Sequence, residues 1–241
     1  MVTKRNQFHF IYIFNSYKKL GILICLFLFL HSCKSDRQLD KKFAIKFTKN
    51  QKLYFVETAY DKGVNHKWVK GNITYALGSK FEPSEQDFIK KTMDYISSLK
   101  NLPQMRLTEG HGDITFYKPT TTVAFNNLAK DAYLWRGFTR SEYNLDNTPK
   151  KSDIFIKTDQ TNLNIEITIQ HELMHTLGLL CHPNTKFLES SALGRRFFNS
   201  SDPKILPNLP ELDSKALIIL YDKRFLSRSK QTEAKEILGL K

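Results

Sequence analysis

The stretch "HELMHTLGLLCHP", residues 171–183, carries the pattern that decides the fold and the chemistry of this chain. His171 and His175 lie four residues apart, so on a helix their side chains project from one face and can bind one metal ion. Glu172 follows the first histidine, where its carboxylate could take a proton from a water molecule on that metal. The spacing predicts two metal ligands and a general base, as metal-assisted peptide hydrolysis requires.

The residues around this motif predict that it lies on a helix. Four apolar residues recur at every fourth position: Ile165, Ile169, Leu173 and Leu177. This spacing is typical of a helix that buries one stripe of side chains, and Asn162 or Asn164 could cap its start. Gly178 can adopt the left-handed conformation that ends helices at low cost. We therefore expect a helix that starts near residue 162 and ends at Gly178.

With Gly178 included, "HELMHTLG" resembles the HExxHxxGxxH motif of the metzincin zinc peptidases. Together with a late "LIILYDKRF", it is similar to a group of bacterial exported metzincin-like domains. The resemblance implies an α/β (α+β) zincin domain that binds one Zn²⁺ ion per chain. Such a domain has a twisted mixed sheet, a long N-terminal helix, an active-site helix and a short irregular C-terminal subdomain with one helix.

The third metal ligand is where the chain departs from the metzincin motif, whose last histidine position falls on Cys181. Zinc accepts a thiolate as well as an imidazole, so Cys181 could bind directly. A turn one residue longer would bring in His182 instead, and Pro183 supports a change of direction there because it restricts His182 to extended conformations. We prefer His182 and keep Cys181 as the alternative. A carboxylate from downstream, with Glu211 the best placed, is a third option.

Two further positions bear on the resemblance. Met174 is the last methionine of the chain, so the methionine turn that metzincins place beneath the metal has no counterpart. Tyr221 lies where some metzincins have a tyrosine that stabilises the oxyanion, and the resemblance implies that role for it. A helical aromatic residue without any catalytic role is the alternative interpretation.

Residues 1–32 have the features of a secretory signal: basic residues without an acid, the apolar run "GILICLFLFL", and then "HSC" ending at Cys33. Residues 30–33 also resemble the lipobox of bacterial lipoproteins, in which the cysteine carries the lipid. An uncleaved membrane anchor is the alternative. We expect residues 33–43 to be a lipidated cysteine and flexible tether, and residues 44–241 to form the single metzincin-like domain. The chain would then be exported and lipid-anchored in the cell envelope, at the outer membrane or cell surface.

The charge pattern argues against a nucleic-acid binder. The formal net charge is +13, but acidic residues are interspersed among the lysines and no long basic block occurs. No nucleic-acid-binding motif accompanies the charge. We expect a monomer whose partners are a protein or peptide substrate and, through the lipid, a membrane.

Outside the motif, short β-branched and aromatic runs predict strands and longer periodic runs predict helices. The predicted strands are residues 53–60, 66–78, 112–117, 121–125 and 152–158. A helix is predicted from a capping box at Ser84 and Asp87 up to Pro103, and a second buried helix starts at Pro210. Residues 139–151 read as a loop, and the charged tail from residue 223 has a weak helical pattern at most.

Together these features predict a zinc-dependent endopeptidase. His171, His175 and His182 would hold the zinc, which polarises the scissile carbonyl, and Glu172 would activate the attacking water. An upstream edge strand would hold an extended substrate by β-augmentation. The alternative is a catalytically inactive, zinc-stabilised binding lipoprotein, which would show a closed four-ligand site containing both Cys181 and His182. A membrane-anchored interaction protein without metal is a further alternative.

Overall fold

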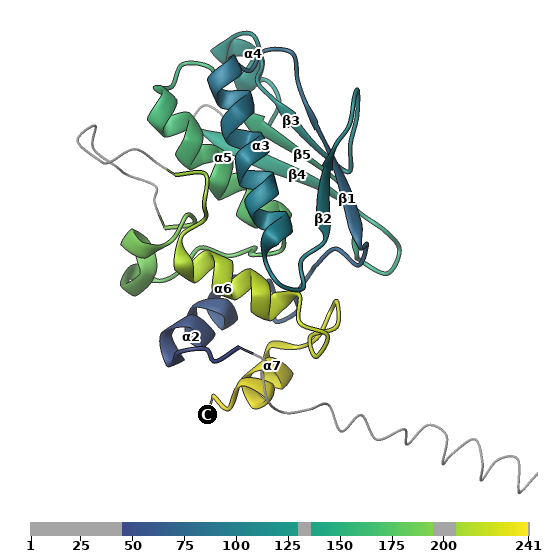
Figure 1. Cartoon of the computed structure of the whole chain (residues 1–241), viewed down its shortest axis with the longest axis vertical. Helices are drawn as coiled ribbons and strands as arrows, with labels where there is room; N and C mark the ends of the chain where they lie inside the picture. The colour runs from purple at the N-terminus through teal and green to yellow at the C-terminus, as the bar shows by residue number, and fades with distance from the viewer. Residues whose placement is uncertain (1–44, 130–135, 195–205, 241) are drawn as a thin grey trace, which may run out of the picture. The chain divides into compact units, whose positions relative to one another are not determined.

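A five-stranded mixed sheet organises the chain (Figure 1). The computed structural model describes residues 45–129, 136–194 and 206–240. The sheet has the order β2-β1-β3-β5-β4, with β1 (Asn72–Leu77), β2 (Gln104–Leu107), β3 (Ile114–Tyr117), β4 (Gly137–Tyr143) and β5 (Pro149–Ile156). Strands β2, β1, β3 and β5 are parallel, and β4 runs antiparallel to β5 at the edge. The predicted α/β fold with a mixed sheet is confirmed.

Two helices, α3 (Pro83–Ser98) and α5 (Asn162–Thr176), pack beside the sheet (Figure 1). Helix α3 contacts β2, α5 contacts β4 and β5, and the two helices contact each other. The core strand residues Ile73, Ile114, Phe116, Ile154 and Ile156 are fully buried. Because α5 lies against β4 and β5, its histidine motif is held at that edge of the sheet.

Aromatic packing holds β4 at the edge. Phe138 of β4 stacks on Phe155 of β5, with ring centroids 4.8 Å apart. Phe125, from the short helix α4 (Thr122–Asn126), meets the ring of Phe138 edge-on at 5.4 Å. Such ring pairs stabilise a fold by more than the burial of their apolar surface alone. The edge strand is thus fixed by side chains on β5 and α4.

The remaining helices form a second group, in which α2 (Lys49–Thr58) packs against α6 (Glu211–Leu220) and α7 (Gln231–Leu238). Between α5 and α6 lies a 3₁₀ helix, η2 (Thr185–Ser190). Most of α6 is buried, as are Tyr54 and Phe55 of α2. The part of the chain after α5 contains two α-helices in its described residues, whereas the sequence predicts one.

Two predicted strands are helices. Residues 53–60 lie mostly in α2, which begins with a capping box between Thr48 and Gln51. Consecutive apolar residues of this helix are buried, so it lacks the one-sided periodicity that identifies a surface helix. Residues 121–125 belong largely to α4, where the Thr121 side chain accepts a hydrogen bond from the backbone N of Ala124. A hydroxyl cap therefore decides the structure of this short segment.

Residues 139–151, predicted as a loop, instead contain most of β4, the connection to β5 and the start of β5. Their polar composition misled the prediction, because an edge strand needs little apolar surface. Helix α3 is confirmed, although its capping box joins Glu82 and Glu85 rather than Ser84 and Asp87. The strand predicted at residues 66–78 is confirmed as the shorter β1.

The predicted signal, the lipidated Cys33 and the tether to residue 43 lie outside the described residues. No helix in the described ranges is long and apolar enough to cross a membrane.

A buried ion pair joins the start of α3 to the end of β3. Lys118 Nζ lies 2.6 Å from Oε1 and 2.9 Å from Oε2 of Glu85. Because Lys118→Ala leaves this carboxylate buried without its cation, we expect the free energy of unfolding to fall by about 3 kcal/mol in urea titrations. Lys91→Ala, which removes an exposed pair with Asp87, should cost less than about 1 kcal/mol. Equal losses in the two variants would contradict this prediction.

Lys67 is buried beside the end of α6, where its Nζ donates to the carbonyl O of Leu220 at 2.9 Å. Burial lowers the pKa of Lys67 from 10.5 to about 8. Between these values the unfolded chain binds more protons than the folded chain, so folding stability rises with pH across this window. We expect urea unfolding to show a larger gain in stability from pH 8 to pH 10 for the natural protein than for Lys67→Met. If the free energy of unfolding changed with pH equally in the two proteins, this prediction would be wrong.

Candidate metal centre

Helix α5 carries His171, Glu172 and His175, as the sequence predicts, and it ends at Thr176, just before the turn at Gly178. Gly178 has φ +104°, in the left-handed region. The backbone N of Leu179 donates to the carbonyl O of Met174 at 2.9 Å, which closes the helix end in the manner of a Schellman motif. A Cβ atom at position 178 would lie 2.3 Å from the carbonyl O of His66. Only glycine therefore fits this turn without a shift of the neighbouring backbone.

Two aromatic side chains fix the last turn of α5. Trp68 Nε1 donates to the carbonyl O of Thr176 at 2.9 Å, and the Tyr221 hydroxyl donates to the carbonyl O of Leu177 at 3.1 Å. Burial raises the pKa of Tyr221, which keeps the phenol protonated as a donor. The structure places Tyr221 at this helix end and does not bring it into the histidine cluster described next. Its proposed contact with an oxyanion remains a prediction that this position does not favour.

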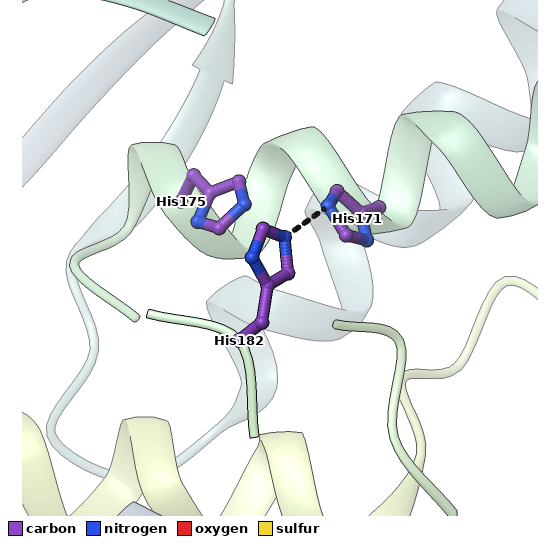
Figure 2. A group of neighbouring side chains, drawn as sticks. All are labelled: His171, His175 and His182. Atoms are coloured by element: carbon purple, nitrogen blue, oxygen red, sulfur yellow. Dashed lines mark hydrogen bonds between the residues drawn. The ribbon is translucent and has the colours of Figure 1, made fainter. Parts of the chain in front are cut away.

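His171, His175 and His182 converge on one point (Figure 2). One ring nitrogen from each residue can be chosen so that the three atoms lie within 4.8 Å of one another. The Nε2 atoms of His182 and His171 are 3.1 Å apart. The first two rings project from α5, and the third comes from the chain beyond the Gly178 turn. The structure thus forms a group of three imidazoles that could hold a metal ion.

The hydrogen bonds of the α5 histidines prepare their rings for a metal. His171 Nδ1 lies 3.1 Å from the carbonyl O of Ala192, and His175 Nδ1 lies 2.9 Å from the carbonyl O of Leu179. A carbonyl oxygen can only accept, so each Nδ1 carries the hydrogen and each Nε2 is the ring nitrogen that can bind a metal ion. Nitrogen ligands of tetrahedral zinc lie about 3.3–3.4 Å apart, because Zn–N distances are about 2.0–2.1 Å. The 3.1 Å between the Nε2 atoms of His171 and His182 is close to this spacing, and all three ligand atoms lie within 4.8 Å of one another, so the three side chains could hold a metal ion.

Cys181 faces α2 and lies outside the histidine cluster. Its backbone N donates to the carbonyl O of Thr58 at 2.9 Å, and its Sγ donates to the carbonyl O of Tyr60 at 3.3 Å. Burial raises the pKa of this thiol, which disfavours the thiolate that a metal needs. The structure brings His182 rather than Cys181 beside the α5 histidines, and it offers no closed site made with both residues.

Asn184 anchors the other side of the turn that presents His182. Asn184 Nδ2 donates to Oε1 of Glu57 at 2.7 Å, and its backbone N donates to Oε2 at 3.4 Å. Glu57 belongs to α2, so residues on both sides of His182 are bound to the last turn of α2 or to the residues just after it. Glu211, the carboxylate alternative, accepts a hydrogen bond from Gln51 and is not a member of the cluster.

Glu172 is buried against the edge strand β4. The Thr139 hydroxyl of β4 lies 3.0 Å from the carbonyl O and 3.1 Å from Oε2 of Glu172. Gly137 permits this approach, because a Cβ there would lie 2.5 Å from Thr168 Cγ2 of α5. The sequence does not predict β4, nor therefore the contacts of Gly137 and Thr139 with α5. No signal in the sequence identifies Thr139, because its contact with Glu172 depends on how the strand packs on the helix.

Comparison with known proteins assigns no family to this chain. No protein-family model matches it, and no curated protein gives a significant match. The geometry of the residues described above therefore carries the functional argument.

Proposed function

We propose that this protein is a zinc-dependent endopeptidase with a metzincin-like domain. The observation that carries the proposal is the convergence of His171, His175 and His182, with Glu172 next to the first of them on the same helix. Imidazole nitrogens suit zinc, and three protein ligands leave a position open for water, as in catalytic rather than structural zinc sites.

In this proposal the residues of the chain divide the chemistry among them. Zinc, when bound, supplies a Lewis acid and a water molecule that ionises near neutral pH. Glu172 would act as the general base that takes a proton from the attacking water. The same carboxyl group then returns the proton to the amide nitrogen as the C–N bond breaks. The fixed hydrogen bonds of His171 and His175 hold the two α5 rings in place during the reaction.

The substrate would bind along β4, which lies at the edge of the sheet nearest to α5. An extended peptide can add to such an edge through backbone hydrogen bonds. Thr139 lies on this strand and contacts the general base, so a peptide paired with β4 would lie close to Glu172. We therefore propose β4 as the substrate-binding edge strand, which the sequence alone does not identify.

Thr139→Val is expected to lower kcat/KM for peptide hydrolysis by about 10-fold, because Glu172 loses a hydrogen bond that fixes its carboxylate. The change keeps the shape of the side chain and the zinc ligands. A matched control is Thr115→Val in β3 of the same sheet. This change removes a hydroxyl that donates to the carbonyl O of Gly112. Steady-state kinetics of both variants measure the effect. If the two variants lost activity equally, the contact with Glu172 would have no specific role.

Metal analysis and a casein-type cleavage assay on the full-length protein test the proposed function. We expect about one zinc ion per chain. Cleavage should stop when a chelator removes the zinc and return when zinc is restored. Bound zinc without any cleavage would instead support the binding lipoprotein. A protein that bound no metal would refute both and support a metal-free interaction protein.

We further propose that the protein is exported and anchored to a membrane by lipid on Cys33, because residues 21–33 follow the order of a lipoprotein signal. Metabolic labelling with a radioactive fatty acid tests this. Label that persists in Cys33→Ser would contradict it.

A further inference from the structure

A buried carboxylate outside the histidine motif lies behind the metal centre. Asp213, in the first turn of α6, is fully buried. Its Oδ1 accepts a hydrogen bond from the Tyr54 hydroxyl at 2.5 Å, and its Oδ2 accepts one from the backbone N of Ala192 at 2.7 Å. Burying a carboxylate is costly, so each of its hydrogen bonds strongly fixes the group that donates it.

The same Ala192 is the hydrogen-bond partner of a cluster histidine. Its carbonyl O accepts from His171 Nδ1 at 3.1 Å, while its backbone N is bound to Asp213. Ala192 therefore stands between α6 and α5, with one backbone group turned to each. The amide and the carbonyl belong to different peptide units, so Asp213 acts on the carbonyl by fixing the position of the residue.

The turn that contains Ala192 has little freedom of its own. The backbone N of Gly194 donates to the Ser191 hydroxyl at 3.0 Å, and that hydroxyl donates to the carbonyl O of Phe187 at 3.1 Å. A Cβ atom at position 194 would lie 2.2 Å from the carbonyl O of Leu188. The segment from Ser191 to Gly194 is therefore held close to η2 and presents the Ala192 carbonyl at a defined place.

We propose that Asp213 is a positioning residue of the metal centre. It holds the Ala192 carbonyl where it fixes the ring orientation and the Nδ1–H tautomer of His171. This inference rests on the proposed zinc site. Groups that hydrogen-bond the second nitrogen of a ligating histidine change metal affinity about 10- to 100-fold when they are lost. Asp213 acts one step further out, through a rigid backbone turn.

A purely structural role would have a different signature. If Asp213 only joined α6 to α2, its loss would lower the stability of the metal-free protein and leave the metal affinity of folded molecules unchanged. The two roles therefore separate when stability and affinity are measured on the same variants. The metal dissociation constant is also independent of whether the protein is an active peptidase.

The experiment compares Asp213→Ala with Asp213→Asn in the full-length protein. Alanine removes the acceptor of the Ala192 amide, whereas the asparagine side-chain oxygen can still accept from it. Dissociation constants for Zn²⁺ and Co²⁺ are measured by competition with a coloured chelator, beside the thermal unfolding midpoint of the metal-free protein and the visible spectrum of bound Co²⁺. Glu85→Ala is the matched control, because it removes another buried carboxylate, one paired with Lys118.

We expect Asp213→Ala to weaken Zn²⁺ binding about 10-fold and to change the Co²⁺ spectrum, and Asp213→Asn to restore most of the affinity. Glu85→Ala should lower the unfolding midpoint while changing the dissociation constant by no more than about twofold. Should Asp213→Ala not fold, Asp213→Ser, whose shorter hydroxyl cannot serve both donors, replaces it.

If Asp213→Ala bound zinc as tightly as the natural protein, the positioning role of Asp213 would be wrong, while the proposed function would be unaffected. If Asp213→Asn bound zinc as weakly as Asp213→Ala, the positioning role would also be contradicted, because the asparagine oxygen would be present without restoring the affinity. A natural protein that bound no metal would refute the proposed function as well, so the two failures are distinguishable.

Discussion

Glu172→Ala is expected to abolish peptide hydrolysis while the protein still binds about one zinc ion per chain. General-base catalysis contributes about 10²- to 10⁴-fold to such reactions, and Glu172 is the carboxylate next to the first cluster histidine on α5. The hydrogen bonds from His171 to Ala192, from His175 to Leu179 and between His182 and His171 do not involve this side chain. Measurement of kcat/KM on a casein-type substrate, together with zinc content, gives both quantities from one preparation.

Glu166→Ala provides the control for the Glu172 variant. It removes a carboxylate from the same helix, outside the HExxH motif, and should retain most of the activity. Loss of zinc together with activity in Glu172→Ala would mean that the variant damages the site rather than the chemistry. Residual hydrolysis above about a tenth of the natural rate would exclude Glu172 as the general base.

His182→Ala should weaken zinc binding by more than about 100-fold, whereas Cys181→Ala should keep the zinc. Loss of a group that only supports a ligand already costs about 10- to 100-fold, so loss of a ligand itself should cost more. Cys181 donates a hydrogen bond to Tyr60 and is not a member of the histidine cluster. Competition with a coloured chelator measures both variants in parallel. The reverse pattern, with zinc lost in Cys181→Ala and kept in His182→Ala, would move the third ligand to the thiol.

The elements that the sequence predicts well have a clear local pattern of apolar residues. Helices α3 and α5 repeat their apolar residues at helical spacing, and β3 and the end of β5 are short runs rich in β-branched and aromatic residues. Helix α2 fails because it buries consecutive residues, Tyr54 to Val56, so that its pattern resembles a strand. Strand β4 fails for the opposite reason, since its mostly polar residues look like a loop. In both cases the partner element, which the local sequence does not reveal, decides the structure.

The same division applies to the candidate site. Two histidines on one helix follow from a spacing of four residues, whereas Gly178 and Pro183 only favour His182 as the third member and leave Cys181 as the alternative. The contacts of Thr139 with Glu172 and of Ala192 with His171 and Asp213 join residues that are far apart in the chain. Such contacts depend on the packing of β4 on α5 and on the position of Ala192 between α5 and α6, which no local pattern encodes.

Residues 181–184 are attached to α2, so detachment of α2 and loss of metal from the candidate metal centre would be coupled. Cys181 is bound to the carbonyl groups of Thr58 and Tyr60, and Asn184 is bound to Glu57. A molecule in which α2 detaches loses the support of His182, so a metal held by His182 must in turn oppose that detachment. The same coupling applies to mechanical force. Tension on the chain before α2 would lower the affinity for the metal, and a bound metal would increase the force needed to detach α2.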